Sequence, residues 1–239
     1  MKLRRIGNGI ARRILHTGMN LGNARECPMC GWTGLQFHPN GTSRKYRYDA
    51  RCPRCRSLER HRLVWVLLHD ELQGMRPETL HVAPEPCIEP WLRSISSRYL
   101  SMDLYKPAMA RMDLTKMTLE DASFSLIWCS HVLEHIPDDR AAMAEMFRVC
   151  RPGGTVVVQV PVWRQVTYEN PSVTTREERL AHFYQDDHVR LYGMDVVRRL
   201  EEAGFVVDVR RAQNLDPEVI QRHGLSYIST NEVFVCTRP

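Results

Sequence analysis

Two Cys-x-x-Cys pairs near the start of the chain have the residue types and spacing of a metal site. The pairs are Cys27-Pro28-Met29-Cys30, followed by Gly31, and Cys52-Pro53-Arg54-Cys55. Between Cys30 and Cys52 lie 21 residues, which include the hairpin-turn dipeptide Asn40-Gly41. Four thiolates can bind one zinc ion tetrahedrally, and four protein ligands leave no open position for catalysis. We therefore predict a structural Zn²⁺ held by Cys27, Cys30, Cys52 and Cys55. A redox Cys-x-x-Cys is the alternative.

A second group of reactive side chains follows a buried-looking apolar run. Phe124 to Ser130 reads as a strand, and it is followed at once by His131, Glu134 and His135. A helical pattern then leads to a Gly-Gly turn and the apolar run Thr155 to Pro161, so that the segment reads as a βαβ unit of a parallel sheet. Ligands bind at the carboxyl ends of parallel strands, where a histidine could remove a proton from a substrate.

Composition and charge limit the class of protein. The chain has 239 residues, 43% of them hydrophobic, and no apolar run reaches the 18 or so residues of a membrane-spanning helix. Without a recognisable export signal, we expect a cytoplasmic protein with reduced cysteines. Residues 1–65 carry a net charge of +11 and residues 66–239 carry −6. The basic front suggests an anionic partner, such as nucleic acid, or simply a solvated basic surface.

The segment His131-Val132-Leu133-Glu134-His135-Ile136-Pro137-Asp138, followed by Arg151-Pro152-Gly153-Gly154, resembles class I S-adenosylmethionine-dependent methyltransferases. The resemblance covers roughly residues 78–238. It implies an α/β fold with a doubly wound, mostly parallel, Rossmann-like sheet of seven strands. We expect four parts: a basic segment at 1–25, a zinc ribbon at 26–57, a connecting helix at 58–77 and a methyltransferase domain at 78–239. Residues 1–25 could form a basic amphipathic helix or a frayed tail.

The resemblance also implies where S-adenosylmethionine would bind. The expected contacts are the turn after the first strand, an acid that ends the second strand, an Asp-Leu pair after the third and a serine that ends the fourth. These residues are His81, Ala83, Glu85, Asp103, Asp113, Leu114 and Ser130. The first turn departs from the family pattern because it has no glycine, the residue that normally lets the backbone approach the cofactor closely. Asp113 could instead cap the following turn.

For the reaction itself, His131 and His135 are the candidate catalytic residues, although either could be a scaffold residue. The polar segment 162–192 reads as a lid, and it supplies the candidate substrate contacts His182, His188, Arg190 and Tyr192. Its histidines and aromatic residues favour a small-molecule or glycan-like methyl acceptor.

Two other functions stay open. One is RNA methylation, with phosphates bound by the basic residues Arg44, Lys45, Arg47, Arg51, Arg54 and Arg56. The other is a non-catalytic recruiting protein that keeps the fold, which the glycine-free turn would favour.

Overall fold

The computed structural model describes residues 18–41, 46–225 and 229–239, so most of the predicted N-terminal basic segment lies outside the described residues. The chain forms two compact units. The first unit comprises Met1–His69 and Ala212–Tyr227, and the second comprises Asp70–Arg211 and Ile228–Pro239. No helix among the described residues is long and apolar enough to cross a membrane.

The first unit contains short strands around the four cysteines. β1 (Arg25–Glu26) pairs with β2 (Thr33–Gly34), and β3 (His38–Asn40) pairs with β4 (Arg47–Arg51), both antiparallel. α2 (Glu59–Leu72) starts in this unit. η2 (Ala212–Asn214) and α7 (Pro217–His223) lie wholly within it. The sequence analysis did not anticipate that α7 belongs to the cysteine unit.

Buried Arg62 holds α7 within the first unit. Its guanidinium donates hydrogen bonds to the carbonyls of Ala50, Ser57, His223 and Gly224. The same group stacks 3.8 Å from the ring centre of Phe37. Satisfying four backbone acceptors with one planar fork compensates for burying the charge.

The second unit is built on one seven-stranded sheet with the order β13-β14-β9-β8-β5-β6-β7. The strands are β5 (Glu78–Val82), β6 (Arg98–Asp103), β7 (Ala110–Arg111), β8 (Phe124–Ser130), β9 (Cys150–Gln159), β13 (Val206–Arg211) and β14 (Glu232–Thr237). Only β14 runs antiparallel to its neighbours, and the other pairings are parallel. This confirms the predicted doubly wound, mostly parallel sheet of the class I methyltransferase type.

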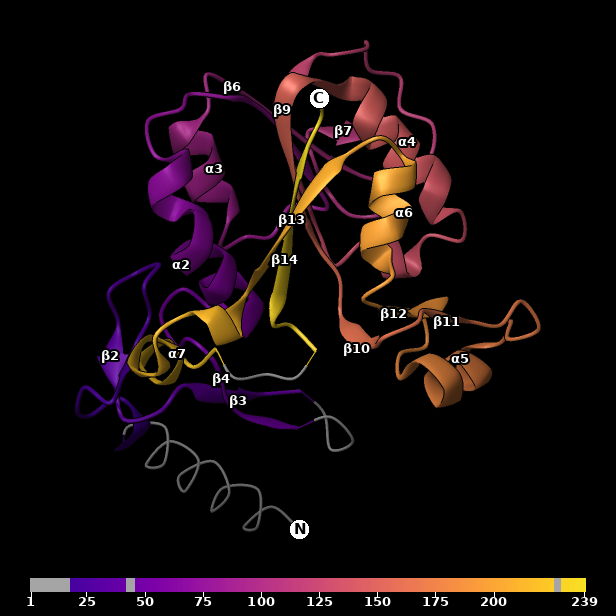
Figure 1. The fold of residues 1–239 in the computed structure, drawn as a ribbon. Helices are drawn as coiled ribbons and strands as arrows, with labels where there is room; N and C mark the ends of the chain where they lie inside the picture. Colours follow the sequence, from indigo (N-terminus) through magenta and orange to yellow (C-terminus); the bar gives the residue numbers. More distant parts are fainter. Residues whose placement is uncertain (1–17, 42–45, 226–228) are drawn as a thin grey trace. The chain divides into compact units, whose positions relative to one another are not determined.

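Helices cover both faces of the sheet. α3 (Glu89–Ile95) packs on one face, and α4 (Asp139–Val149) and α6 (Val196–Glu202) pack on the other (Figure 1). Asp138 caps α4 by accepting a hydrogen bond from the backbone of Ala141. The apolar sides of α4 and α6 form a single core with β5, β8, β9 and β14. The helices thereby hold the carboxyl ends of the parallel strands in fixed positions.

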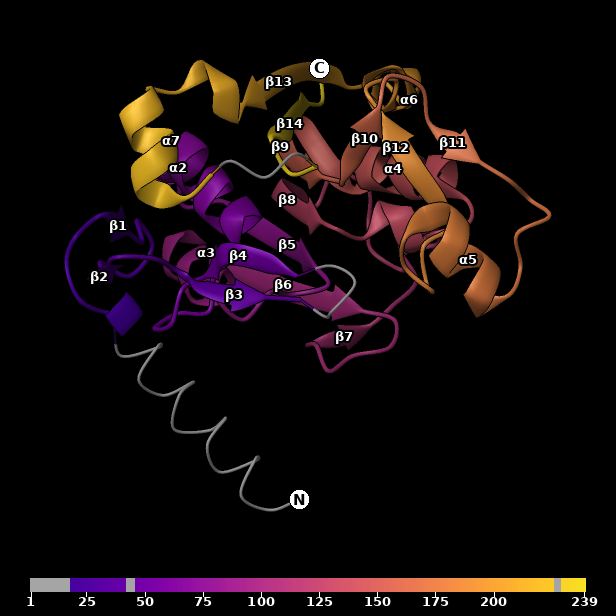
Figure 2. The same cartoon turned by 90° about the horizontal axis from the view of Figure 1, so that it is seen from below.

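The segment predicted as a polar lid has more regular structure than the sequence suggested. β10 (Val162–Arg164), β12 (Arg190–Gly193) and β11 (Tyr168–Glu169) form a small sheet in that order. α5 (Arg176–Phe183) lies beside them (Figure 2). It starts with a capping box formed by Thr175 and Glu178. The third strand of the main sheet, β7, covers only Ala110–Arg111, and the predicted Asp113-Leu114 pair lies just beyond its end.

Candidate donor site and cysteine cluster

The four cysteines predicted to bind zinc converge in the first unit. The Sγ atoms of Cys27 and Cys55 are 3.5 Å apart, and those of Cys30 and Cys52 are 3.6 Å apart. All four sulfurs lie within 4.8 Å of one another. A disulfide would need about 2.05 Å between sulfurs. Zn–S bonds of about 2.3 Å in a tetrahedron place the sulfurs about 3.8 Å apart. The donor set and its spacing therefore fit a four-thiolate metal ion.

The two Cys-x-x-Cys turns have the same backbone geometry. Gly31 donates its N–H to the carbonyl of Cys27 at 2.9 Å, and Arg56 donates to that of Cys52 at 3.0 Å. Both residues have positive φ, 66° for Gly31 and 65° for Arg56. The second turn thus places an arginine where the first has a glycine. Buried Ser57 adds a hydroxyl 3.2 Å from the sulfur of Cys55.

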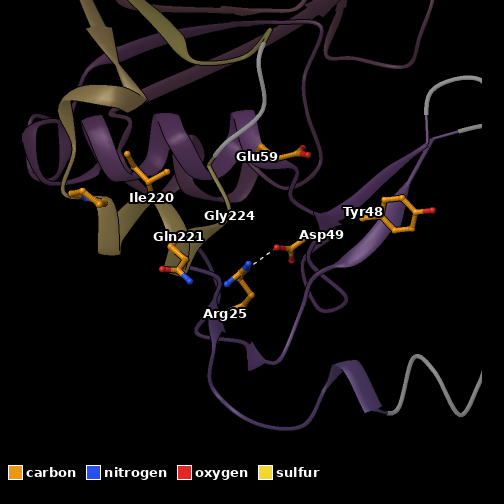
Figure 3. Close-up of a pocket in the computed structure, with 8 residues that line it drawn as sticks. Arg25, Tyr48, Asp49, Glu59, Ile220, Gln221 and Gly224 are labelled. Atoms are coloured by element: carbon orange, nitrogen blue, oxygen red, sulfur yellow. Dashed lines mark hydrogen bonds and ion pairs between the residues drawn. The ribbon is translucent and has the colours of Figure 1, made fainter.

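A pocket of about 330 Å³ also lies in the first unit, between β4 and α7 (Figure 3). Its two acids already have partners in the protein: Arg25 pairs with Asp49 at 2.7 Å, and Arg47 pairs with Glu59 at 3.0 Å. Because these charges are neutralised locally, we assign the pocket no part in the chemistry.

In the second unit, the parallel neighbours β5 and β8 mark the point where the strand order reverses. The chain adds β6 and β7 on one side of β5 and then returns to add β8 and β9 on its other side. Doubly wound sheets bind ligands outside the carboxyl ends of the strands at such a point. The first residue after each strand is strained here, with φ of 49° at Ala83 and 54° at His131. Left-handed backbone in residues other than glycine is uncommon and concentrates at functional sites. The turn that lacks a glycine therefore still adopts a conformation that glycine would favour.

Ala83→Gly should stabilise the protein by about 1 kcal/mol, because it removes the cost of a left-handed alanine, partly offset by the greater freedom of glycine in the unfolded chain. Thermal unfolding should show a midpoint about 2–4 °C higher. Ala142→Gly in α4 is the control, and it should lower the midpoint. A lower midpoint for Ala83→Gly would contradict the strain at this turn.

Polar side chains meet at this end of the sheet. The hydroxyl of Ser130, at the end of β8, lies 3.2 Å from Oε1 of Glu85 and 3.3 Å from Oε1 of Gln159, which ends β9. The structure thus brings the predicted cofactor residues Glu85 and Ser130 together. It adds Gln159, which the sequence analysis missed although a polar residue closing the run Val156–Val158 was a signal.

Buried His81 contacts the backbone of the turn after β5. Its buried ring contacts the hydroxyl of Tyr99 through Nδ1 at 2.9 Å and accepts from the backbone N–H of Glu85 through Nε2 at 3.4 Å. Burial lowers the pKa of His81 to about 4, so the ring is neutral at pH 7. We therefore assign His81 to positioning the Ala83–Glu85 turn from beneath.

This pKa predicts a loss of stability in acid. The unfolded chain takes up a proton on His81 near pH 6.5, whereas the folded protein takes it up only near pH 4. Stability should therefore be complete above about pH 6.5 and fall as the pH drops towards 4, with about 3 kcal/mol at stake for this group. Urea unfolding of wild type and His81→Gln from pH 7.5 to 4 measures the difference. A variant with the same pH dependence as wild type would contradict this role.

The acids predicted to contact the cofactor lie at the carboxyl ends of the next strands. Asp103 ends β6, next to β5 in the sheet, and its Oδ1 accepts hydrogen bonds from the backbones of Tyr105 and Lys106, each at 2.7 Å. Asp113 uses Oδ1 in the same way, accepting from the backbone and hydroxyl of Thr115, which lowers its pKa. These bonds involve Oδ1 alone in each carboxylate, and Leu114 is buried.

The loop after β8 contains the candidate catalytic histidines. Nδ1 of His131 lies 3.2 Å from Oε1 of Glu134, and the His135 ring meets that of His188 edge-on, 4.6 Å between centres. Glu134 is only 1% exposed. Its burial acts to raise the pKa, but the close approach of His131 and the other nearby imidazoles outweigh it and keep the pKa below its usual value.

The predicted substrate residues separate into two groups. His188 lies in the cluster with His135, and it is buried. His182, on α5, instead pairs with the hydroxyl of Tyr168 at 2.7 Å. Buried Arg190 donates to the carbonyls of Leu133, Ile136 and Pro137, and the hydroxyl of buried Tyr192 donates to Asp139 at 2.6 Å. Arg190 and Tyr192 therefore hold the loop after β8 in place.

Comparison with known proteins identifies part of the second unit. Residues 89–158 match the family model described as a methyltransferase domain. A probable S-adenosylmethionine-dependent methyltransferase of Mycolicibacterium smegmatis is 32% identical over 96 residues, 40% of this chain and 34% of that protein. A protein of transposon Tn4556 of Streptomyces fradiae is 34% identical over 97 residues, 40% of this chain and 28% of that protein. The chain thus matches about a third or less of each relative's length.

A solved structure supports the fold over a longer stretch. An S-adenosylmethionine-dependent methyltransferase from Mesorhizobium loti superposes with a TM-score of 0.53, covering 73% of this chain and 96% of that one at 16% identity. At this identity the similarity concerns the fold alone.

Proposed function

We propose that this chain, of which residues 89–158 match a methyltransferase domain, binds S-adenosylmethionine at the carboxyl ends of β5, β6 and β8 and transfers its methyl group to a small-molecule or glycan-like acceptor. The observation that supports this most strongly is the strained, polar junction between β5 and β8. Ala83 and His131 both have positive φ there, and Glu85 lies beside Ser130.

The residues present suit the donor. Oδ2 of Asp103 can accept hydrogen bonds from a ribose diol, and Asp113 with Leu114 can meet the adenine. The left-handed Ala83 opens the turn after β5 towards the methionine end. When bound, S-adenosylmethionine supplies an electrophilic methyl group on a sulfonium. Glu85 and Ser130, which hold each other in place, would line the methionine end of this site.

The acceptor would approach over the loop after β8. Methyl transfer is an SN2 displacement, so alignment of donor and acceptor can supply much of the rate. His135, whose side chain is 34% exposed, is placed to contact the acceptor and take its proton, and His131 orients the buried Glu134 beside it. His182 stands apart with Tyr168, where it could contact a larger acceptor.

We also propose that the four cysteines bind a structural zinc ion. Four convergent thiols without a disulfide support it, together with the paired turns at Gly31 and Arg56. The ion would take no part in methyl transfer because four protein ligands fill its coordination shell.

A radiolabelled methyl-transfer screen tests the function. Purified zinc-loaded protein is incubated with labelled S-adenosylmethionine and, separately, small hydroxylated or amino compounds, oligosaccharides and total RNA. Transfer to one of the first two sets supports the proposal. Transfer to RNA alone would replace it.

RNA remains the second candidate because Arg54 and Arg56, beside the cysteine cluster, are both exposed. Arg47 is instead paired with Glu59, and Arg44 and Lys45 lie outside the described residues. If phosphates bind here, RNA affinity should fall steeply with salt and weaken in Arg54→Ala/Arg56→Ala. Flat, weak binding would remove this candidate.

A further inference from the structure

Three ligand-type side chains converge beside the proposed donor site. Glu134 and His135 come from η1 (Leu133–His135), directly after β8, and His188 comes from the turn before β12. One potential ligand atom from each lies within 4.8 Å of the others. His135 and His188 are 53 positions apart in sequence, and Arg190 helps to bring them together through its hydrogen bonds to the loop after β8. The cluster is therefore a product of the tertiary fold.

The carboxylate of Glu134 is an unusual group to bury here. The residue is 1% exposed, and neither of its oxygens has a well-aligned hydrogen bond within the described residues, although Oε1 lies 3.2 Å from His131. A buried carboxylate that lacks strong partners is costly. A cation among Glu134 and the two imidazoles would supply the compensating charge.

Neighbouring groups are arranged as around a bound metal. The carboxylate of Asp187 lies 3.4 Å from Nδ1 of His135, and Nδ1 of His131 lies against Glu134. In metal sites such outer partners orient the ligating imidazole and carboxylate. The side chains of His135 and Asp187 are 34% and 65% exposed, so an ion could enter from solvent.

We propose that Glu134, His135 and His188 bind one divalent transition-metal ion, distinct from the four-cysteine zinc. Two imidazoles and one carboxylate suit Zn²⁺, Fe²⁺, Co²⁺ or Mn²⁺ and leave coordination positions open. Metal–ligand distances of about 2.1 Å place ligand atoms about 3 to 3.5 Å apart. The three ligand atoms lie within 4.8 Å of one another, so only a small movement would bring them onto one ion.

The open positions define the ligand class. Such an ion would bind an oxygen or nitrogen of the methyl acceptor and polarise it next to the donor site, which lowers the acceptor's pKa. With the ion bound, His135 is a ligand, and this polarisation takes the place of proton transfer to its ring. Acceptors with a hydroxyl beside a second oxygen donor, which can chelate, fit best. This catalytic role rests on the proposed methyl transfer, whereas the binding of the ion does not.

Cobalt binding tests the proposal directly. The full chain is prepared with one Zn²⁺ in the cysteine cluster and titrated with Co²⁺ by absorption spectroscopy and calorimetry. We expect one Co²⁺ per chain, with visible ligand-field bands and no thiolate charge-transfer band. Glu134→Gln and His188→Asn should each weaken binding by at least about tenfold, the lower end of what losing an outer partner costs. His69→Asn, on α2, is the matched control and should leave binding unchanged.

Absence of Co²⁺ binding, or binding that survives both substitutions, would overturn the metal site. Because Glu134 and His188 are buried, circular dichroism must show that the variants fold. If they do not, the partly exposed His135→Asn decides by the same criterion. S-adenosylmethionine calorimetry on the same samples separates the two proposals. Donor binding without Co²⁺ binding rejects the metal alone, and Co²⁺ binding without donor binding rejects the methyl-transfer function alone.

Discussion

Replacing Cys52 with serine should unfold the first unit and release its metal. A structural zinc ion contributes about 10–16 kcal/mol of apparent binding free energy in zinc-finger peptides, whereas a whole domain is stable by only about 5–15 kcal/mol. The small core of this cluster, with Cys27, Trp32, Phe37 and Cys52 as its buried members, is too small to replace that contribution. Zinc analysis should give about one equivalent less per chain than wild type.

Hydrogen exchange locates the effect. Amides of β4 and α7 should lose protection together, because Arg62 bonds Ala50, His223 and Gly224 within the same unit. Amides of β8 and β9 in the second unit serve as the internal reference. Cys87→Ser is the matched control, since this partly buried thiol lies outside the cluster. Unchanged zinc content and protection in Cys52→Ser would contradict a structural metal at the cysteines.

Arg190→Leu should destabilise the second unit by about 3–5 kcal/mol, the usual cost of removing one partner of a buried charge network. The substitution leaves three carbonyls of the loop after β8 without their donor. It also removes a positive charge beside Glu169. Burial acts to raise the pKa of Glu169, but the hydrogen bonds from Arg199 and Arg190 outweigh burial and lower this pKa. Urea unfolding measures the loss.

Two further variants distinguish the loss of these hydrogen bonds from the loss of a positive charge alone. Arg190→Lys should recover only part of the stability, because an ammonium cannot reproduce the planar fork. Arg140→Ala removes an exposed pair with Glu202, and it should cost less than about 1 kcal/mol. A loss for Arg190→Leu as small as that for Arg140→Ala would show that Arg190 is free for a substrate, as the sequence suggested.

The parts of the fold that the sequence predicted well are marked by patterns of neighbouring residues. The strand Phe124–Ser130 could be predicted because a continuous apolar run is typical of a buried strand. The cysteine cluster could be predicted equally well, because the spacing within each Cys-x-x-Cys pair indicates a metal site whatever sequence lies between the pairs.

The parts that were missed depend on distant contacts. β10, β11 and β12 have two to four residues each, and their paired residues lie 21 to 30 positions apart in sequence, so no local periodicity marks them. The capping box at Thr175 was a readable signal for α5. Arg190 looked like a substrate contact because its acceptors are backbone carbonyls, which the side-chain sequence does not reveal. For the same reason, the conformation of Ala83 could not be anticipated.

The most direct test of the account is calorimetric titration of S-adenosylmethionine into zinc-loaded wild type, Asp103→Ala and Asp208→Ala. Asp103 ends β6 beside the proposed donor site, whereas Asp208 lies on the edge strand β13 and pairs with Arg210. The account predicts one site per chain, weakened at least about tenfold by Asp103→Ala, the cost of a charged hydrogen bond, and unchanged in Asp208→Ala. Absence of donor binding by folded wild type, or equal affinities in all three proteins, would contradict the proposed donor site.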